Sequence, residues 1–119
     1  MANTLNTEVR NTGENVAVID ISGEINGYSE EALMSAYKEA SNNHTKVIIL
    51  NFSDLKYMNS SGIGLLVTLL IRVKRQKQQL LAYGLNDHYQ QIFELTRLNE
   101  TIKIYGSEEA AQAAVAAPA

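Results

Sequence analysis

Two neighbouring serines, Ser60 and Ser61, are the residues of this 119-residue chain best placed to take part in chemistry. They follow the apolar run 46–52, and Gly62 and Gly64 come directly after them, at the start of a helical pattern of apolar residues. Both hydroxyls are therefore expected in the first turn of a helix, where free backbone N–H groups and the helix dipole favour an anion. A phosphate on Ser60 would be tolerated there and would add about −1.5 to −2 charges.

The same residues also have a purely structural interpretation. Asn59 and Ser60 would then cap the helix, while Gly62 and Gly64 would allow close packing. If this segment instead contacts a partner, the added charge would abolish binding without unfolding the domain. The spacing alone leaves both interpretations open.

Hydrophobic periodicity predicts strands that alternate with helices around these serines. Strands are expected over residues 5–10, 16–23, 46–52, 79–84 and 102–105, with turn residues at 11–15 and a loop at 53–59. Helices are expected over 30–40, over about 60–78, from Asn86 or Asp87 onward, and from Ser107 onward. Ser29 is expected to cap the first of these helices.

Each of the first three helices has an apolar face at helical spacing. The expected faces are Leu33, Ala36, Tyr37 and Ala40; then Ile63, Leu66, Val67, Leu70 and Val73; then Tyr89, Ile92, Phe93 and Leu95. The order ββαβαβαβα predicts an α/β fold in which helices pack on a mostly parallel mixed sheet that begins with an antiparallel hairpin.

Composition limits the classes of protein to which the chain could belong. It has 10 Lys and Arg against 13 Asp and Glu, no cysteine, and 45% hydrophobic residues. We expect one domain, residues 1–119, whose alanine-rich last few residues fray. The lack of cysteine excludes disulfides, zinc fingers and thiol nucleophiles. The net charge of −3 argues against nucleic acid as a partner, and no signal peptide or membrane-spanning run is visible, so a soluble, cytoplasmic protein is expected.

Several further residues are candidates for contact with a partner protein. Tyr28 is one, and Tyr57 and Met58 would be either exposed apolar anchors or plugs that pack onto the sheet. A basic strip near the end of the second helix either complements the helix dipole or steers an acidic partner; its residues are Arg72, Lys74, Arg75 and Lys77. His44 and His88 lack companions for a metal site and are expected at the surface.

A family resemblance adds to this interpretation. The segment 54–66, DLKYMNSSGIGLL, resembles the signature of the STAS domain, the module of anti-sigma-factor antagonists and of the cytosolic tails of sulfate transporters. The segment 21–26, ISGEIN, resembles the family's "GELD" segment after the second strand. The order of helices and strands agrees with the family over residues 4–116.

The resemblance implies partner switching. In the antagonists, the unmodified protein binds an anti-sigma factor that is also a serine kinase of the histidine-kinase-like ATPase type, and this frees the sigma factor. Phosphorylation of the serine at the helix start ends the binding, and a serine phosphatase restores it. Aligned on residues 59–62, the phosphoacceptor is Ser60, with Ser61 as the alternative. The implied partner-binding residues are Asn26, Tyr28, Tyr57, Met58, Asn59, Ser60, Ser61, Gly62 and Ile63, and no catalytic residue, cofactor or metal is expected.

The chain departs from the family pattern at two positions. Asn59 and Asn26 stand where the family usually has aspartate, so hydrogen bonding is kept and a negative charge is lost. A phosphoserine between two neutral amides would suffer less repulsion, or else recognition by the kinase has been lost.

Three other functions remain open. The first is an enzyme with Ser60 or Ser61 as nucleophile and a histidine as base, although the chain lacks a G-x-S-x-G motif. The second is a module that binds a nucleotide or another ligand, although no G-x-x-x-x-G-K-[ST] loop is present. The third is a STAS scaffold whose serine is never modified.

Overall fold

The computed structural model describes residues 5–42 and 44–116 of the chain. The predicted fraying concerns mainly residues 117–119, which lie outside the described residues. The described elements are, in order, β1 (Leu5–Asn11), β2 (Val16–Ile25), α1 (Glu30–Ala40), β3 (Val47–Met58), α2 (Ser60–Arg75), β4 (Gln79–Tyr83), α3 (Asp87–Leu95), the 3-10 helix η1 (Leu98–Glu100), β5 (Lys103–Tyr105) and α4 (Glu108–Ala116).

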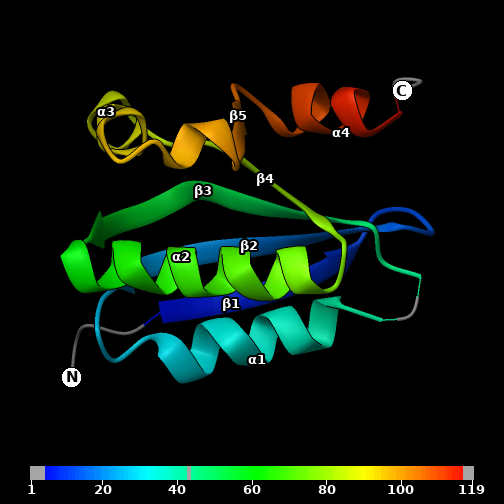
Figure 1. Ribbon diagram of the computed structural model, residues 1–119, viewed down its shortest axis with the longest axis horizontal. Coiled ribbons are helices and arrows are strands. Elements are labelled where there is room, and N and C mark those ends of the chain that lie inside the picture. The colour runs from blue at the N-terminus through cyan, green and yellow to red at the C-terminus, as the bar shows by residue number, and fades with distance from the viewer. Residues whose placement is uncertain (1–4, 43, 117–119) are drawn as a thin grey trace.

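The strands form one sheet whose spatial order, β1-β2-β3-β4-β5, is also the order along the chain. β1 runs antiparallel to β2, and every later neighbour is parallel, which confirms the predicted α/β class and hairpin. Helices α1 and α2 lie against one face of the sheet, and α4 lies against the other (Figure 1). None of the helices described here is long and apolar enough to cross a membrane.

Alternating side chains of β2 and β3 divide the core between the two faces of the sheet. Ile19 and Leu50 pack into the larger cluster, which also holds the buried residues of α1, α2 and α3. Val18 and Ile49 point the other way, into a smaller cluster with Ala111 of α4. Because both faces of these strands are covered, the sequence shows continuous apolar runs here.

The predicted helix faces are confirmed in part. All four residues expected to be buried on α1 are buried. On α2, Val67 is 38% exposed, and Leu69 is buried in its place. On α3, the prediction for Leu95 is wrong, because its side chain is 81% exposed. The helix ends there, the chain reverses at Arg97 with a positive φ of 63°, and Leu98 enters the core instead.

The loop predicted at residues 53–59 is instead the second half of β3. β2 also continues past its predicted end to Ile25, and the pairing extends as far as Ile25 with Met58, with two register shifts. β4 pairs with β3 only as far as Asn51, so beyond that point β3 has a neighbour on one side only. The polar residues in the segment predicted to be a loop are therefore exposed residues of a strand.

Two smaller predictions about helix ends need correction. α2 stops at Arg75 because Lys77 takes a positive φ of 60° and turns the chain, so that the Gln78 side chain accepts a hydrogen bond from the Tyr37 hydroxyl at 2.8 Å. Ser29 occupies the N-cap position of α1, but its side chain does not cap the helix. Its hydroxyl instead accepts a hydrogen bond from the Asn26 N–H at 2.9 Å.

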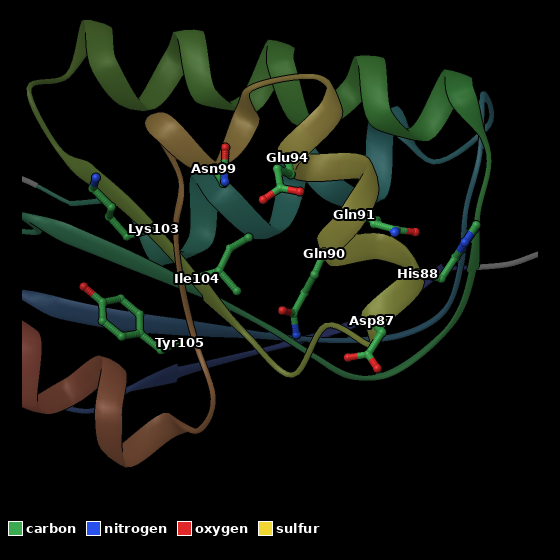
Figure 2. Close-up of a pocket in the computed structure, with 9 residues that line it drawn as sticks. All are labelled: Asp87, His88, Gln90, Gln91, Glu94, Asn99, Lys103, Ile104 and Tyr105. Carbon is green, nitrogen blue, oxygen red and sulfur yellow. The ribbon is translucent and has the colours of Figure 1, made fainter.

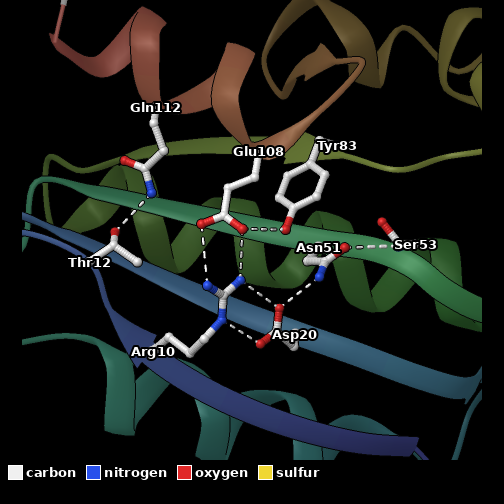
Figure 3. A network of polar contacts seen from close by, with 8 residues as sticks. All are labelled: Arg10, Thr12, Asp20, Asn51, Ser53, Tyr83, Glu108 and Gln112. Atoms are coloured by element: carbon white, nitrogen blue, oxygen red, sulfur yellow. Dashed lines mark hydrogen bonds and ion pairs between the residues drawn. The ribbon is translucent and has the colours of Figure 1, made fainter.

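A polar network on the α4 side of the sheet joins α4 to the hairpin (Figure 3). The Arg10 guanidinium donates to both Asp20 oxygens, at 2.6 and 2.9 Å, and to both Glu108 oxygens, at 3.2 and 3.0 Å. The Tyr83 hydroxyl donates to Glu108 at 3.0 Å, and the Asn51 amide donates to Asp20 at 2.7 Å. One cation therefore binds two carboxylates that come from different elements.

This network changes the acidity of its members. Hydrogen bonds from Arg10 hold the pKa values of Asp20 and Glu108 below their ordinary values of 3.8 and 4.5. Burial, reinforced by Glu108, raises the pKa of Tyr83 to about 12. Lowered carboxylate pKa values mean that the folded state gains stability from the ionised forms and loses it as the pH falls through the folded values.

Replacing the guanidinium tests this network. We expect Arg10→Gln to lower the free energy of unfolding at neutral pH by about 1 kcal/mol, because the Arg10 side chain is 37% exposed and solvent screens its ion pairs. The difference from wild type should shrink as the pH falls below 4.5 and 3.8, the ordinary pKa values of Glu108 and Asp20, towards the lower values that both carboxylates have in the folded protein. Urea unfolding across this range measures it, with Arg72→Gln as the control. A difference that is independent of pH would contradict the role given to the carboxylates.

Candidate functional site

Ser60 and Ser61 are the first two residues of α2, and both are exposed. Only Asn59 separates them from the end of β3. The Asn59 side chain accepts a hydrogen bond from the Gly62 N–H at 2.9 Å, and the Asn59 N–H donates to the Ile25 carbonyl at 3.2 Å. The predicted cap is confirmed for Asn59, whereas Ser60 is the first residue of the helix itself. These two bonds fix the junction between β3 and α2.

The segment after β2 lies beside this junction. Asn26 is buried, and its side-chain oxygen accepts a hydrogen bond from the Tyr28 N–H at 2.8 Å. A Cβ atom placed on Gly27 would lie 3.6 Å from Cβ and 3.8 Å from Oγ of Ser61. Ser61 therefore faces the Gly27 backbone. Tyr28, the next residue along, is 93% exposed.

The structure brings the predicted partner-binding residues to one end of the sheet but does not expose all of them. Exposed residues are Tyr28, Tyr57, Ser60 and Ser61, and partly buried ones are Asn59 and Ile63. Asn26, Met58 and Gly62 are buried, so they offer a partner little or no side-chain surface. Of the two roles considered for Met58, the structure supports the plug, because its side chain packs into the core at 4% exposure.

The two glycines of α2 differ in what the fold requires of them. A Cβ atom on Gly62 would lie 2.4 Å from the Ile25 carbonyl oxygen and 2.9 Å from Cγ2 of Ile25, so only glycine fits there. A Cβ atom on Gly64 would meet nothing within 4 Å. The predicted packing role is confirmed for Gly62 and wrong for Gly64. Glycine inside a helix costs about 1 kcal/mol relative to alanine, and the fold of this chain does not require that cost at Gly64.

The electrostatics of the helix start favour an added anion. The first turn of α2 contains no acidic residue, so the helix places no carboxylate of its own at the positive end of its dipole. The two amides that replace family aspartates, Asn59 and Asn26, use their side-chain oxygens as acceptors from backbone N–H groups. They make hydrogen bonds that an aspartate could also make, without its charge.

Tyr89 belongs to the structure of this site, although its spacing in the sequence predicts only a place on the apolar face of α3. Its hydroxyl accepts a hydrogen bond from the Met58 N–H at 2.8 Å, and the side chain is 5% exposed. This bond ties the start of α3 to the last residue of β3, two positions before Ser60. A buried tyrosine needs a partner for its hydroxyl, but the sequence does not identify a backbone group 31 residues away.

A hollow of about 700 Å³ lies elsewhere, between α3 and β5; its lining includes Asp87, His88, Glu94 and Lys103 (Figure 2). None of the predicted site residues lines it.

His44 and His88 are exposed, as expected, and no hydrogen bond within the described ranges joins either histidine to Ser60 or Ser61. Across those ranges, no three of His, Cys, Asp and Glu gather as they would around a metal ion.

Comparisons with known proteins agree with this geometry. The family model of the STAS domain matches residues 7–111. The anti-sigma-B factor antagonist of Listeria monocytogenes is 27% identical over 90 residues, which cover 76% of this chain and 79% of that protein.

Two solved structures of one protein are also similar. The anti-sigma factor antagonist SpoIIAA in its unphosphorylated form has a TM-score of 0.74 at 19% identity, covering 96% of this chain and 100% of that one. The phosphorylated form of SpoIIAA from Bacillus has a TM-score of 0.71 at 21% identity, with coverages of 92% and 99%. These likenesses confirm the predicted fold.

The contrast between the two glycines predicts opposite effects of the same substitution. Gly62→Ala should destabilise the fold by about 1–3 kcal/mol, because the new methyl group would overlap the Ile25 carbonyl. Gly64→Ala should instead stabilise it by up to about 1 kcal/mol. Urea unfolding of both variants measures the two effects. Equal effects on the two stabilities would show that Gly62 does not hold α2 against β2.

Proposed function

Because this chain belongs to the STAS domain family, we propose that it is an anti-sigma factor antagonist of the partner-switching kind, controlled in the cytoplasm by phosphorylation of Ser60. In its unmodified form it binds an anti-sigma factor that is also a serine kinase of the histidine-kinase-like ATPase type. The kinase phosphorylates Ser60, the complex dissociates, and a serine phosphatase restores the binding form. The protein itself catalyses no reaction.

The observation that carries this proposal is the exposed Ser60 hydroxyl at the mouth of α2, on a junction fixed by Asn59. The residue is open to a kinase, and its first turn carries no acidic group that would repel a phosphate. A dianion there leaves the buried contacts of Met58 and Gly62 unchanged while altering the surface beside them. Membership of the STAS domain family and similarity to anti-sigma factor antagonists support the identity of the partner.

The surroundings favour Ser60 over Ser61 as the acceptor. The Ser61 side chain lies beside Gly27, where an added Cβ atom would be in van der Waals contact with it. Phosphorylation there would press on the segment that carries Asn26 and Tyr28. The geometry does not support the enzyme alternative, because no histidine is hydrogen-bonded to Ser60 or Ser61 in the part of the chain described.

Partner capture tests the switch. Ser60→Ala should capture the anti-sigma factor kinase in a pull-down from the source bacterium, and Ser60→Asp should bind the same purified kinase at least about tenfold more weakly, because an unpaired charge is desolvated at the contact. Titration calorimetry measures both affinities. Phosphate-affinity electrophoresis should show that Ser60→Ala is not phosphorylated and that Ser61→Ala is. Phosphorylation of Ser60→Ala, or equal affinity of Ser60→Asp, would overturn the assignment.

The neutral amide at position 59 gives a second test. Asn59→Asp should keep the cap on Gly62 and leave the unphosphorylated protein about as stable as wild type. Phosphorylation should then cost the variant more stability than it costs wild type, because the new carboxylate repels the phosphate on the next residue. Thermal unfolding of both forms of both proteins measures this coupling. Equal costs would contradict the idea that the amide eases acceptance of the phosphate.

A further inference from the structure

α2 has a second, outward stripe besides the one it buries. Gly62, Leu66, Leu69 and Val73 form its buried side. On the solvent side, five exposed residues follow one another at spacings of four, three, four and four; they are Ser60, Gly64, Val67, Ile71 and Arg75. Such spacing places them along one face of the helix. We refer to these five residues as the outward stripe.

Two residues of the outward stripe are apolar and poorly covered. Val67 is 38% exposed and Ile71 is 52% exposed. Single exposed apolar residues need no explanation, but these two are adjacent on the same helix face and in line with Ser60. At a rise of about 1.5 Å per residue, the stripe runs for about 20 Å. Its narrow, regular spacing matches the ridge that one helix presents to another.

Gly64 is the second residue of the outward stripe, between Ser60 and Val67. No neighbour in the fold needs the space that its missing side chain leaves. Helix propensity alone would favour alanine at this position, so the glycine is unexplained by the stability of this chain. It does give a flat place, one turn after Ser60, at which the backbone of another protein can approach closely.

Charge limits the kind of partner that fits. Residues 60–75 contain no acidic side chain, and the last turn carries Arg72, Lys74 and Arg75. Arg75 ends the outward stripe, so the surface changes from a hydroxyl through small and apolar residues to a positive charge. A matching surface is apolar near its middle and acidic opposite Arg75.

We propose that the outward stripe docks against a helix of the anti-sigma partner, a helix with an apolar ridge and an acidic side chain opposite Arg75. This inference rests on the proposed function and deepens it by assigning the contact. Gly64 lets the two helices approach, and Val67 and Ile71 fill the contact. Ser60 is the first residue of the stripe, so its phosphate places a dianion at one end of the same contact.

The test uses a substitution that stabilises the free protein. The probe is the purified anti-sigma factor kinase that the pull-down identifies by mass spectrometry. Gly64→Ala should unfold at a higher temperature than wild type yet bind the kinase at least about tenfold more weakly, because the methyl group separates the helices. Gly13→Ala is the matched control: Gly13 lies in the turn of the β1–β2 hairpin, and a Cβ atom there also meets nothing within 4 Å. It should bind as wild type does.

Three further variants test the contact and its occupant. Ile71→Gln should weaken binding, and the loss caused by Arg75→Glu should be restored by changing the facing acidic residue of the kinase to lysine. A photo-crosslinking residue at position 67 should attach to a helix of the kinase.

The inference is overturned if Gly64→Ala and Ile71→Gln both bind as wild type does, or if the crosslink maps to a segment that is not helical. Failure of the switch is separate, because these affinities are measured on unphosphorylated protein. A wild-type chain that binds no anti-sigma factor would overturn both proposals.

Discussion

The Ile25 carbonyl is the point on which the arrangement of the candidate site depends. It accepts the Asn59 N–H, and it lies so close to α2 that residue 62 can only be glycine. These two contacts hold the first turn of α2 against the end of β2. Ser60 is exposed because the residues around it are fixed: Gly62 faces inward, Asn59 caps the turn, and Met58 anchors the strand. A mobile hydroxyl would not give a partner a defined surface to lose.

The sequence predicts features that depend on local chemistry. The buried face of α1, the hairpin, and the cap at Asn59 all follow from spacing and side-chain type over a few residues, and the structure confirms them. The position of Ser60 in the first turn of α2 follows in the same way. The site could therefore be located from sequence, although the depth of each residue in it could not.

The features that the sequence did not predict depend on tertiary contacts. The polar residues 53–57 look like a loop until β2 pairs with them, and Leu95 looks buried until the reversal at Arg97 is known. Leu69 is buried and Val67 is exposed because of the way α2 lies across the sheet, which a helical pattern alone does not determine. Tyr89 has its partner 31 residues away, and Arg10 has partners 10 and 98 residues away. No local signal in the sequence identifies those partners.

The link between Arg10 and Glu108 has a consequence for the order in which the chain can fold. Every strand pairs with the strand that precedes it in the chain, so the sheet can grow by adding one strand at a time as the polypeptide leaves the ribosome. The guanidinium on β1, however, must wait for a carboxylate 98 residues later. Because α4 is the last element described in the chain, this bond can form only after all of the strands have been synthesised. Amide protons of α4 should therefore exchange with solvent through a smaller opening than those of the central strands.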